Sequence, residues 1–527
     1  MVSIGGYLSL RINFVTDTTS LSQCDQELCD SLLQSTGRFD LASVRPYLLD
    51  ILFYRIMSAE LEQSMDTVVD GTYAELSDAE AEQYRDRMSG VLGYYMLPSE
   101  LFSVLAAHID EEKNVAGTLL HTFMSIDQPL YDHEHSRQYV PADTYRDIFM
   151  DFDLNFLALH VAELNAWLTS LVKGVAVLDM SDPHALFRRV YDCVMRMPGA
   201  RGLRGTVSSY AQLATEIALT GRASVNAVYD PCCGSADMLL AIKAYCDQNG
   251  VIVEHGFYGE EPEADESALG RMRLLMSDLP IDAFSVQTSD TLKKWTFRHN
   301  RFDTIVTHPR FSAHWDPRSM EHDPRFTPAG VLASRNNADW AYLMDVVACL
   351  SDEGTAAVIF PTESLWRVDT AERTIRQHLL DTNVIDTIIE MPSRLLNDTT
   401  ISTSLVILRK NKTDERIRFI NATDQFVEEN YRRSLSEDNM RSIMAAYQSE
   451  EEIDGVMRLV TVSEMKAHNG SLYVPDYILG AENPREDFHS MMSHMEQSSQ
   501  SQNADMMNGM GALGALATMM NGFNQQN

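Results

Sequence analysis

Apolar positions follow two different patterns along this chain, and the first has the period of a helix. In the stretch 45–63 the apolar residues share one helical face, and they are Leu48, Leu49, Leu52, Phe53, Ile56 and Met57. Similar stripes run through 99–109 and 156–175. The pattern predicts an all-helical N-terminal domain over residues 1–175. Because it carries neither a Gly-rich loop nor a catalytic cluster, we interpret it as a packing or assembly domain.

The second pattern extends from near residue 200 to about 425. In this part of the chain short strand-like runs alternate with amphipathic helices. The runs are 223–230, 251–261, 302–309, 354–361, 383–392, 402–410 and 416–423. Helical stretches such as 235–246 and 337–350 separate several of them. This alternation predicts an α/β fold with a mainly parallel, doubly wound Rossmann-like sheet in a domain over 176–480. Ligands of such sheets bind at the carboxyl ends of the strands.

The last segment, 481–527, is rich in Met, Ser, Gln, Asn and Gly and poor in charge. Such a composition favours disorder, with a short Met-rich docking surface as the alternative. A segment of this kind does not present a long regular seam to a partner. We therefore expect it to contribute little to assembly.

The charge balance changes the functional picture, because 76 Asp and Glu residues face 42 Lys and Arg residues, a net charge of −34. An acidic surface repels phosphate backbones, so the chain is poorly suited to hold DNA by itself. If it acts on DNA, a basic partner or one local basic cleft must supply the attraction. The alternative is an acidic protein with no role on nucleic acid.

Cysteine spacing and hydropathy bound the location of the protein. Seven scattered cysteines without a Cys-x-x-Cys pair indicate neither a disulfide framework nor a zinc site, and they suit a reducing cytoplasm. The N-terminal residues do not have the apolar core of a signal peptide, and no run of 18 apolar residues occurs. We therefore expect a cytoplasmic protein that does not cross a membrane, and no metal site.

Three acidic residues follow successive predicted strands. Asp230 opens the turn that contains Gly234 and Ala236, directly before a helix, where backbone can approach a nucleotide-like ligand. Glu261 ends the next strand, a common position for a carboxylate that takes both ribose hydroxyls. Asp290 follows a third candidate strand and could meet an adenine amino group. Each alone fits an ordinary strand-to-helix turn, but three in order predict an adenosyl ligand.

A fourth strand ends in His308, Pro309, Arg310 and Phe311. At this place adenine N6-methyltransferases carry Asn-Pro-Pro followed by Tyr or Phe, so the motif is similar to theirs. In that family the Asn oxygen and the next backbone carbonyl accept the two N–H bonds of the adenine amino group. The aromatic residue stacks on a base that is flipped out of the duplex.

The resemblance extends over roughly residues 40–480 and is to the modification (methyltransferase) subunits of type I DNA restriction-modification systems. The segments that carry it are 47–62, 94–106, 228–240, 256–276, 326–367 and 375–423. It implies S-adenosyl-L-methionine as cofactor and adenine N6 in DNA as the methyl acceptor. It also implies a specificity subunit as partner, with a second modification subunit and a restriction subunit as further candidates, and DNA bound mainly through the complex.

The departures from the family pattern fall on the chemistry. The segment that covers the cofactor in the family corresponds to residues 202–207 of this chain, which keep Thr206. The last Gly of the family's Gly-Ser-Gly is replaced by Ala236. The family's Asn becomes His308 and its second Pro becomes Arg310. A methyl group at 236 is costly if the backbone there has a positive φ. A displaced acceptor at 308 and a cation at 310 both oppose methyl transfer.

Two functions follow from these observations. One is adenine N6 methylation with a specificity subunit. The other is a catalytically inactive scaffold or regulatory paralogue that keeps the fold and its subunit contacts. The altered motifs favour weakened cofactor binding and little transfer. Binding of S-adenosylmethionine is the measurement that best separates the two.

Overall fold

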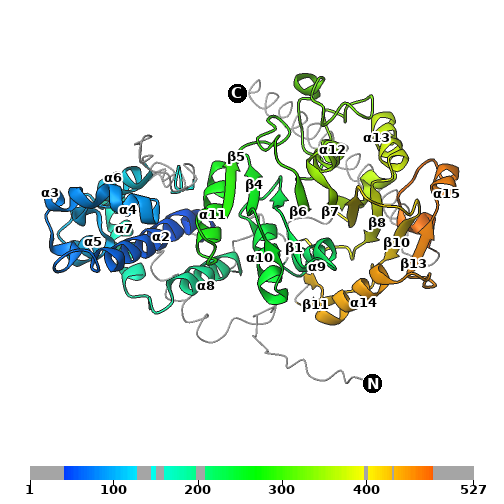
Figure 1. Cartoon of the computed structure of the whole chain (residues 1–527). Helices are drawn as coiled ribbons and strands as arrows, with labels where there is room; N and C mark the ends of the chain where they lie inside the picture. Colours follow the sequence, from blue (N-terminus) through cyan, green and yellow to red (C-terminus); the bar gives the residue numbers. More distant parts are fainter. Residues whose placement is uncertain are drawn as a thin grey trace, which may run out of the picture.

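The computed structural model describes residues 41–127, 144–149, 160–196, 208–396, 401–429 and 432–478. Figure 1 shows a helical region on one side and a large sheet with covering helices on the other. The segment 202–207, with Thr206, lies outside the described residues, as does the tail 481–527. Of the described helices, none combines the length and the apolar character that a bilayer crossing requires.

The helical region has one core, built from the apolar stripes that the sequence carries. Its helices are α2 (Leu41–Met65), α3 (Asp78–Ala81), α4 (Arg85–Leu92), α5 (Phe102–His108), α6 (Val115–Asp127), α7 (Val161–Ala176) and α8 (Pro183–Arg196). The predicted stripe is confirmed, since Leu48, Leu52 and Phe53 of α2 are fully buried. α8 also packs into this core, through Phe187 and Val190. The domain boundary near residue 175 stays a prediction, and the helical packing continues to α8.

The main sheet has nine strands in the order β13-β10-β8-β9-β7-β6-β2-β4-β5. In chain order they are β2 (Val228–Asp230), β4 (Phe257–Glu261), β5 (Phe284–Thr288), β6 (Phe302–Thr307), β7 (Leu350–Pro361), β8 (Ile385–Glu390), β9 (Thr403–Arg409), β10 (Ile417–Asn421) and β13 (Met457–Val460). Two small sheets pair β1 (Ser224–Val225) with β3 (Ile252–Val253) and β11 (Val427–Glu429) with β12 (Arg432–Ser434). β9 runs antiparallel to both its neighbours and β13 antiparallel to β10, whereas the other pairings of this sheet are parallel.

Helices cover both faces of this sheet, so the doubly wound α/β prediction is confirmed. Successive strand residues point to opposite faces. Val306 belongs to the core that α9 (Ser208–Leu219), α10 (Asp237–Asn249) and α14 (Glu437–Gln448) cover, and Ile305 belongs to the core that α12 (Asp339–Cys349) and α13 (Thr370–Asp381) cover. A last short helix, α15 (Val462–Ala467), follows β13.

The helix α11 (Ala264–Leu275) joins the two regions. Its residues Ala268, Leu269 and Met272 belong to the core of the helical region, whereas Leu274 belongs to the core of the sheet. One helix is therefore shared by both cores, and it directly follows the strand that ends in Glu261.

One cysteine departs from the sequence expectation. Cys193 of α8 is disulfide-bonded, whereas the cysteine spacing indicated no disulfide framework. Cys232, Cys233, Cys246 and Cys349 are free thiols.

Candidate cofactor and catalytic site

The four predicted strand-end residues come to the same edge of the sheet. β2 lies between β4 and β6 and is parallel to both, and β5 is parallel to β4. Asp230 and Glu261 are the last residues of β2 and β4, His308 directly follows β6, and Asp290 lies two residues beyond β5. The carboxyl ends of these four strands therefore lie at one edge of the sheet, as the alternating sequence pattern predicted.

The turn over residues 231–236, called the cofactor loop below, is held by hydrogen bonds to the neighbouring strand end. The backbone N–H of Gly234 donates to Oε2 of Glu261 at 3.1 Å, and that of Glu263 donates to Oε1 at 2.9 Å. The N–H of Cys232 donates to Oδ1 of Asp230 at 3.0 Å. Because each carboxylate oxygen can accept two bonds, Glu261 ties two loops together and keeps acceptor capacity for a ligand hydroxyl.

Ala236 ends the cofactor loop in the left-handed region, with φ 68° and ψ 27°. The residue is fully buried. A non-glycine residue in this conformation costs about 1–2 kcal/mol, and it persists only where its surroundings enforce it. The positive φ on which the sequence argument depended is therefore present at this position.

Burial governs the electrostatics of the two carboxylates. Removal from water raises the pKa of Asp230 to about 7, and the nearby charge of Glu261 acts in the same direction. Burial also raises the pKa of Glu261, against the lowering effect of the N–H bonds it accepts and of Arg310. Two acids in one poorly solvated place favour a cationic ligand, because a positive charge stabilises both in their ionised form.

Asp290 is more accessible than these two residues. Its Oδ1 accepts the N–H of Leu292 at 3.0 Å, and its Oδ2 lies 2.8 Å from Nζ of Lys293. The side chain is 27% exposed, so a ligand reaching this edge can contact it.

The catalytic loop, residues 308–312, packs its two rings together. The half-buried His308 and Phe311 have ring centroids 5.1 Å apart at an interplanar angle of 54°. The N–H of Ser312 donates to Oδ1 of Asp339 at 2.7 Å, and Ser364 donates its hydroxyl to Oδ2 at 2.6 Å. Asp339 is buried at the start of α12, so it anchors the loop to the segment after β7.

Sequence reasoning missed Asp339, because the stretch 337–350 shows only an amphipathic helix. The signal available was an acidic residue in the first turn of an otherwise apolar helix. Such a residue reads equally well as an ordinary helix start.

Arg310 extends from the catalytic loop toward the loop after β4. Its Nη2 lies 3.6 Å from Oε1 of Glu263, and the two side chains are 50% and 59% exposed. The cation that replaces a family proline is thus paired with a carboxylate on the side of the candidate cofactor site.

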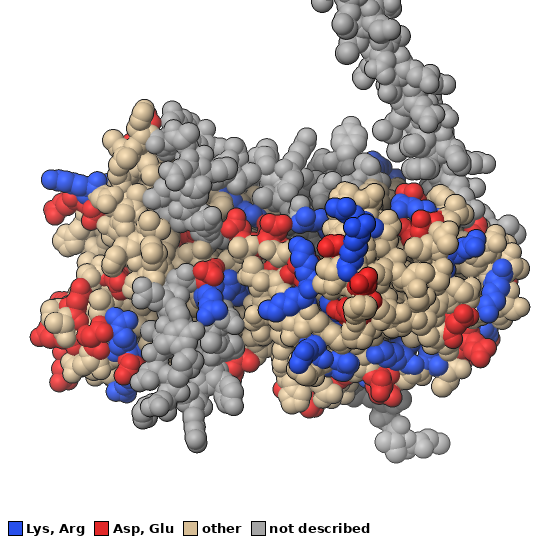
Figure 2. Space-filling model, turned by 90° about the horizontal axis from the view of Figure 1, so that it is seen from above, with Lys and Arg blue, Asp and Glu red and all other residues tan. Residues whose placement is uncertain are grey.

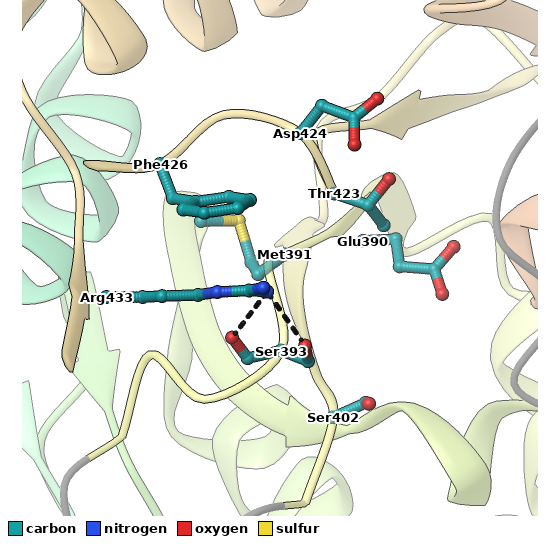
Figure 3. Close-up of a pocket in the computed structure, with 8 residues that line it drawn as sticks. All are labelled: Glu390, Met391, Ser393, Ser402, Thr423, Asp424, Phe426 and Arg433. Atoms are coloured by element: carbon teal, nitrogen blue, oxygen red, sulfur yellow. Dashed lines mark hydrogen bonds between the residues drawn. The ribbon is translucent and has the colours of Figure 1, made fainter. Parts of the chain in front are cut away.

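A separate hollow of about 110 Å³ lies farther along the same edge, beyond the ends of β8 and β10 (Figure 3). The guanidinium of Arg433 lies 3.9 Å from the centre of the Phe426 ring and donates to the hydroxyl of Ser393 at 3.0 Å. The lining residues are Glu390, Met391, Ser393, Ser402, Thr423, Asp424, Phe426 and Arg433. The predicted site residues that the structure describes do not line it.

The chain is similar to known proteins over the segment that contains these strand ends. Residues 190–487 match the model of the N-6 DNA methylase family. The chain is 28% identical over 488 residues to the type I restriction enzyme MpnII methylase subunit of Mycoplasma pneumoniae, covering 86% of this chain and 88% of that one.

Solved structures give the same result. A type I restriction-modification methyltransferase subunit from Streptococcus thermophilus is similar with a TM-score of 0.74 and 26% identity, over 86% of this chain and 99% of that one. A chain from a structure on complex assembly and conformational transition of the type I R-M system has a TM-score of 0.59 at 15% identity, over 92% and 97%. At that identity the likeness concerns the fold alone.

Proposed function

Because the chain belongs to the N-6 DNA methylase family, we propose that it is the modification subunit of a type I restriction-modification system. In this role it transfers a methyl group from S-adenosylmethionine to N6 of adenine in DNA, together with a specificity subunit. The observation that carries the proposal is the meeting of Asp230, Glu261, Asp290 and the His308 loop at one sheet edge, within the segment that matches the family.

The residues at this edge fit the cofactor. When bound, S-adenosylmethionine supplies an electrophilic methyl group on a sulfonium. Asp230 faces the cationic amino-acid part, Glu261 takes ribose hydroxyls, and Asp290 meets the adenine amino group. The raised pKa of the buried Asp230 suits a ligand that carries positive charge.

Cofactor affinity is weaker than in relatives with a glycine at position 236. Ala236 already bears the cost of a left-handed backbone in the free protein. The residue is fully buried with its methyl group toward α11, so this cost acts through the backbone of the cofactor loop. Binding is weakened rather than lost, because the three carboxylates remain.

The catalytic loop receives the target base. An imidazole in its neutral form has one acceptor nitrogen, and at position 308 that nitrogen takes one N–H of the adenine amino group. The backbone carbonyl of Pro309 takes the other, and Phe311 stacks on the flipped base. A displacement of the acceptor by about 1 Å costs on the order of 100-fold in rate, so transfer is slow.

A local excess of basic residues supports a DNA-binding role for a chain that is otherwise acidic. Residues 291–340 contain eight Lys and Arg against five Asp and Glu, and they pack on the side of α12. Figure 2 shows Lys and Arg side chains gathered over the middle of the face seen from above. The exposed ones in this segment include Lys293, Lys294, Arg301, Arg318 and Arg335. Such a face attracts phosphate, while the specificity subunit supplies sequence recognition.

The test is transfer of tritiated methyl from S-adenosylmethionine to DNA, with the chain assembled with its specificity subunit. We expect slow incorporation that is absent from DNA already methylated at N6 of the target adenines. Cofactor binding without any incorporation would instead support the inactive scaffold, which the replacements at His308 and Arg310 favour. No binding and no incorporation in the assembled complex would contradict the proposal. A second modification subunit and a restriction subunit are further proposed partners, to be sought in the same complex.

A further inference from the structure

One face of α11 lies directly against the cofactor loop. A Cβ atom at Gly270 would stand 2.9 Å from the carbonyl oxygen of Gly234, closer than real Cβ atoms come. It would also stand 3.5 Å from the Cβ of Ala236. The absence of a side chain at Gly270 is therefore what allows the helix backbone to reach the loop.

Arg273 lies one turn further along the same face and binds the same end of the loop, where it leads into α10. Its Nη1 donates to Oδ1 of Asp237 at 2.7 Å, to Oγ of Ser235 at 3.1 Å and to the backbone carbonyl of Ser235. The side chain is only 14% exposed. The Ser235 carbonyl belongs to the peptide bond between Ser235 and Ala236. The hydrogen bonds from Arg273 therefore fix the orientation of the peptide that precedes the left-handed residue.

The guanidinium of Arg273 rests on a residue of the helical region. Its carbon lies 4.0 Å from the ring centre of Tyr191 in α8. The Tyr191 hydroxyl lies 3.3 Å from Oγ of Ser235. Three parts of the chain thus meet in one buried cluster: α8, α11 and the cofactor loop.

From this cluster we propose that Arg273, seated on Tyr191, is a positioning residue that holds the cofactor loop in its left-handed turn at Ala236. The helical region thereby becomes part of the cofactor site, and it acts there through the loop. A conformation that is unfavourable for alanine persists only where surrounding contacts enforce it, and the Arg273 bonds are such contacts. The link to cofactor affinity rests on the proposed function, whereas the link to the order of the loop does not.

The matched variants are Arg273→Met and Arg271→Met. Arg271 lies on the same helix and is also buried, but its guanidinium donates to the backbone carbonyls of residues 146 and 147 instead of to the loop. Both variants remove one buried cation from α11. Only Arg273→Met removes the bonds to the cofactor loop.

The first measurement is amide hydrogen exchange of the peptide 231–239 in the free protein. We expect exchange of this peptide to be at least tenfold faster in Arg273→Met, because that variant loses charge-assisted hydrogen bonds to the loop. Exchange should be unchanged in Arg271→Met. Tyr191→Phe should keep most of the protection and Tyr191→Ala should lose it. Equal protection in Arg273→Met and the unchanged protein would overturn the proposal, as would equal loss in both arginine variants.

The second measurement is the affinity for S-adenosylmethionine by titration calorimetry. Arg273→Met should weaken binding about tenfold, and adding Ala236→Gly should recover most of that loss, because glycine needs no help to hold the turn. Additive effects of the two substitutions would contradict the role of Arg273 in enforcing the turn. If the unchanged protein does not bind the cofactor at all, the proposed function fails, while the exchange data still decide this inference.

Discussion

The guanidinium of Arg310 lies 3.6 Å from the carboxylate of Glu263, linking the loop that follows β6 to the loop that follows β4. Both side chains are half exposed, so the pair adds little to stability. Its consequence is electrostatic. Arg310, in the loop that is predicted to carry methyl transfer, has a counter-charge, which reduces its repulsion of a sulfonium.

Removing the carboxylate of Glu263 should weaken the binding of the sulfonium form of the cofactor more than the binding of the form without a sulfonium. Glu263→Gln should weaken the binding of S-adenosylmethionine by about threefold while leaving S-adenosylhomocysteine, which has no sulfonium, within a factor of two. The difference should shrink in high salt. Titration calorimetry at two salt concentrations measures it, with Asp265→Asn as a control of equal charge change. Equal weakening for both ligands would mean that Arg310 does not act on the sulfonium.

Restoring the family's residues in the catalytic loop should raise methyl transfer. His308→Asn with Arg310→Pro should increase incorporation at least tenfold, because the acceptor regains its position and the cation is removed. His308→Ala should lower incorporation below that of the unchanged protein. The readout is tritiated methyl incorporation by the complex with the specificity subunit. Robust transfer by the unchanged protein would make His308 a full substitute for Asn.

The Asp230 side chain should lower the stability of the folded protein while it supports cofactor binding. Its folded-state pKa of about 7 exceeds the ordinary value, so folding disfavours the ionised form and stability is lost as the pH rises toward and through 7. Asp230→Asn should therefore raise the free energy of unfolding at pH 8 by about 1–3 kcal/mol. It should also weaken cofactor binding at least tenfold. Denaturant titrations at pH 5 and 8 test the first effect, which should be clearly smaller at pH 5 than at pH 8.

His184 should make the contact between the helical region and the turn after α11 sensitive to pH. Its ring nitrogens lie 3.0 Å from Glu60 of α2 and 2.6 Å from Asp278. These two carboxylates, Glu60 first, raise its pKa to about 9 against the lowering effect of burial. The stabilisation is complete below about pH 6.5 and is lost as the pH rises through 9.

We expect the free energy of unfolding to fall by about 1–2 kcal/mol over that window, after allowance for the partly exposed partners. His184→Gln should flatten this part of the pH profile. An unchanged slope in the variant would show that other groups cause the loss.

The sequence by itself determined the order of the elements and the identity of the strand-end residues. Buried strands are recognised as short β-rich runs and helices by a period of 3.6 residues, and both are local properties of the sequence. Parallel strands joined by helices bring their carboxyl ends to one edge, so the alternating pattern is enough to predict that Asp230, Glu261 and His308 lie together. The three carboxylates in order then predicted an adenosyl ligand, and the similarity of the 308–311 motif to a known family predicted a bound base.

Only the tertiary structure decided what holds those residues in place. The partners Ser312 and Asp339, Arg310 and Glu263, and Arg273 and Tyr191 lie 27 to 82 positions apart in the chain. The antiparallel direction of β9 and the sharing of α11 between two cores are likewise relations between distant segments. A hydrogen bond between polar side chains depends on how two elements pack against each other. The distance between such side chains cannot be predicted from a periodicity along the chain.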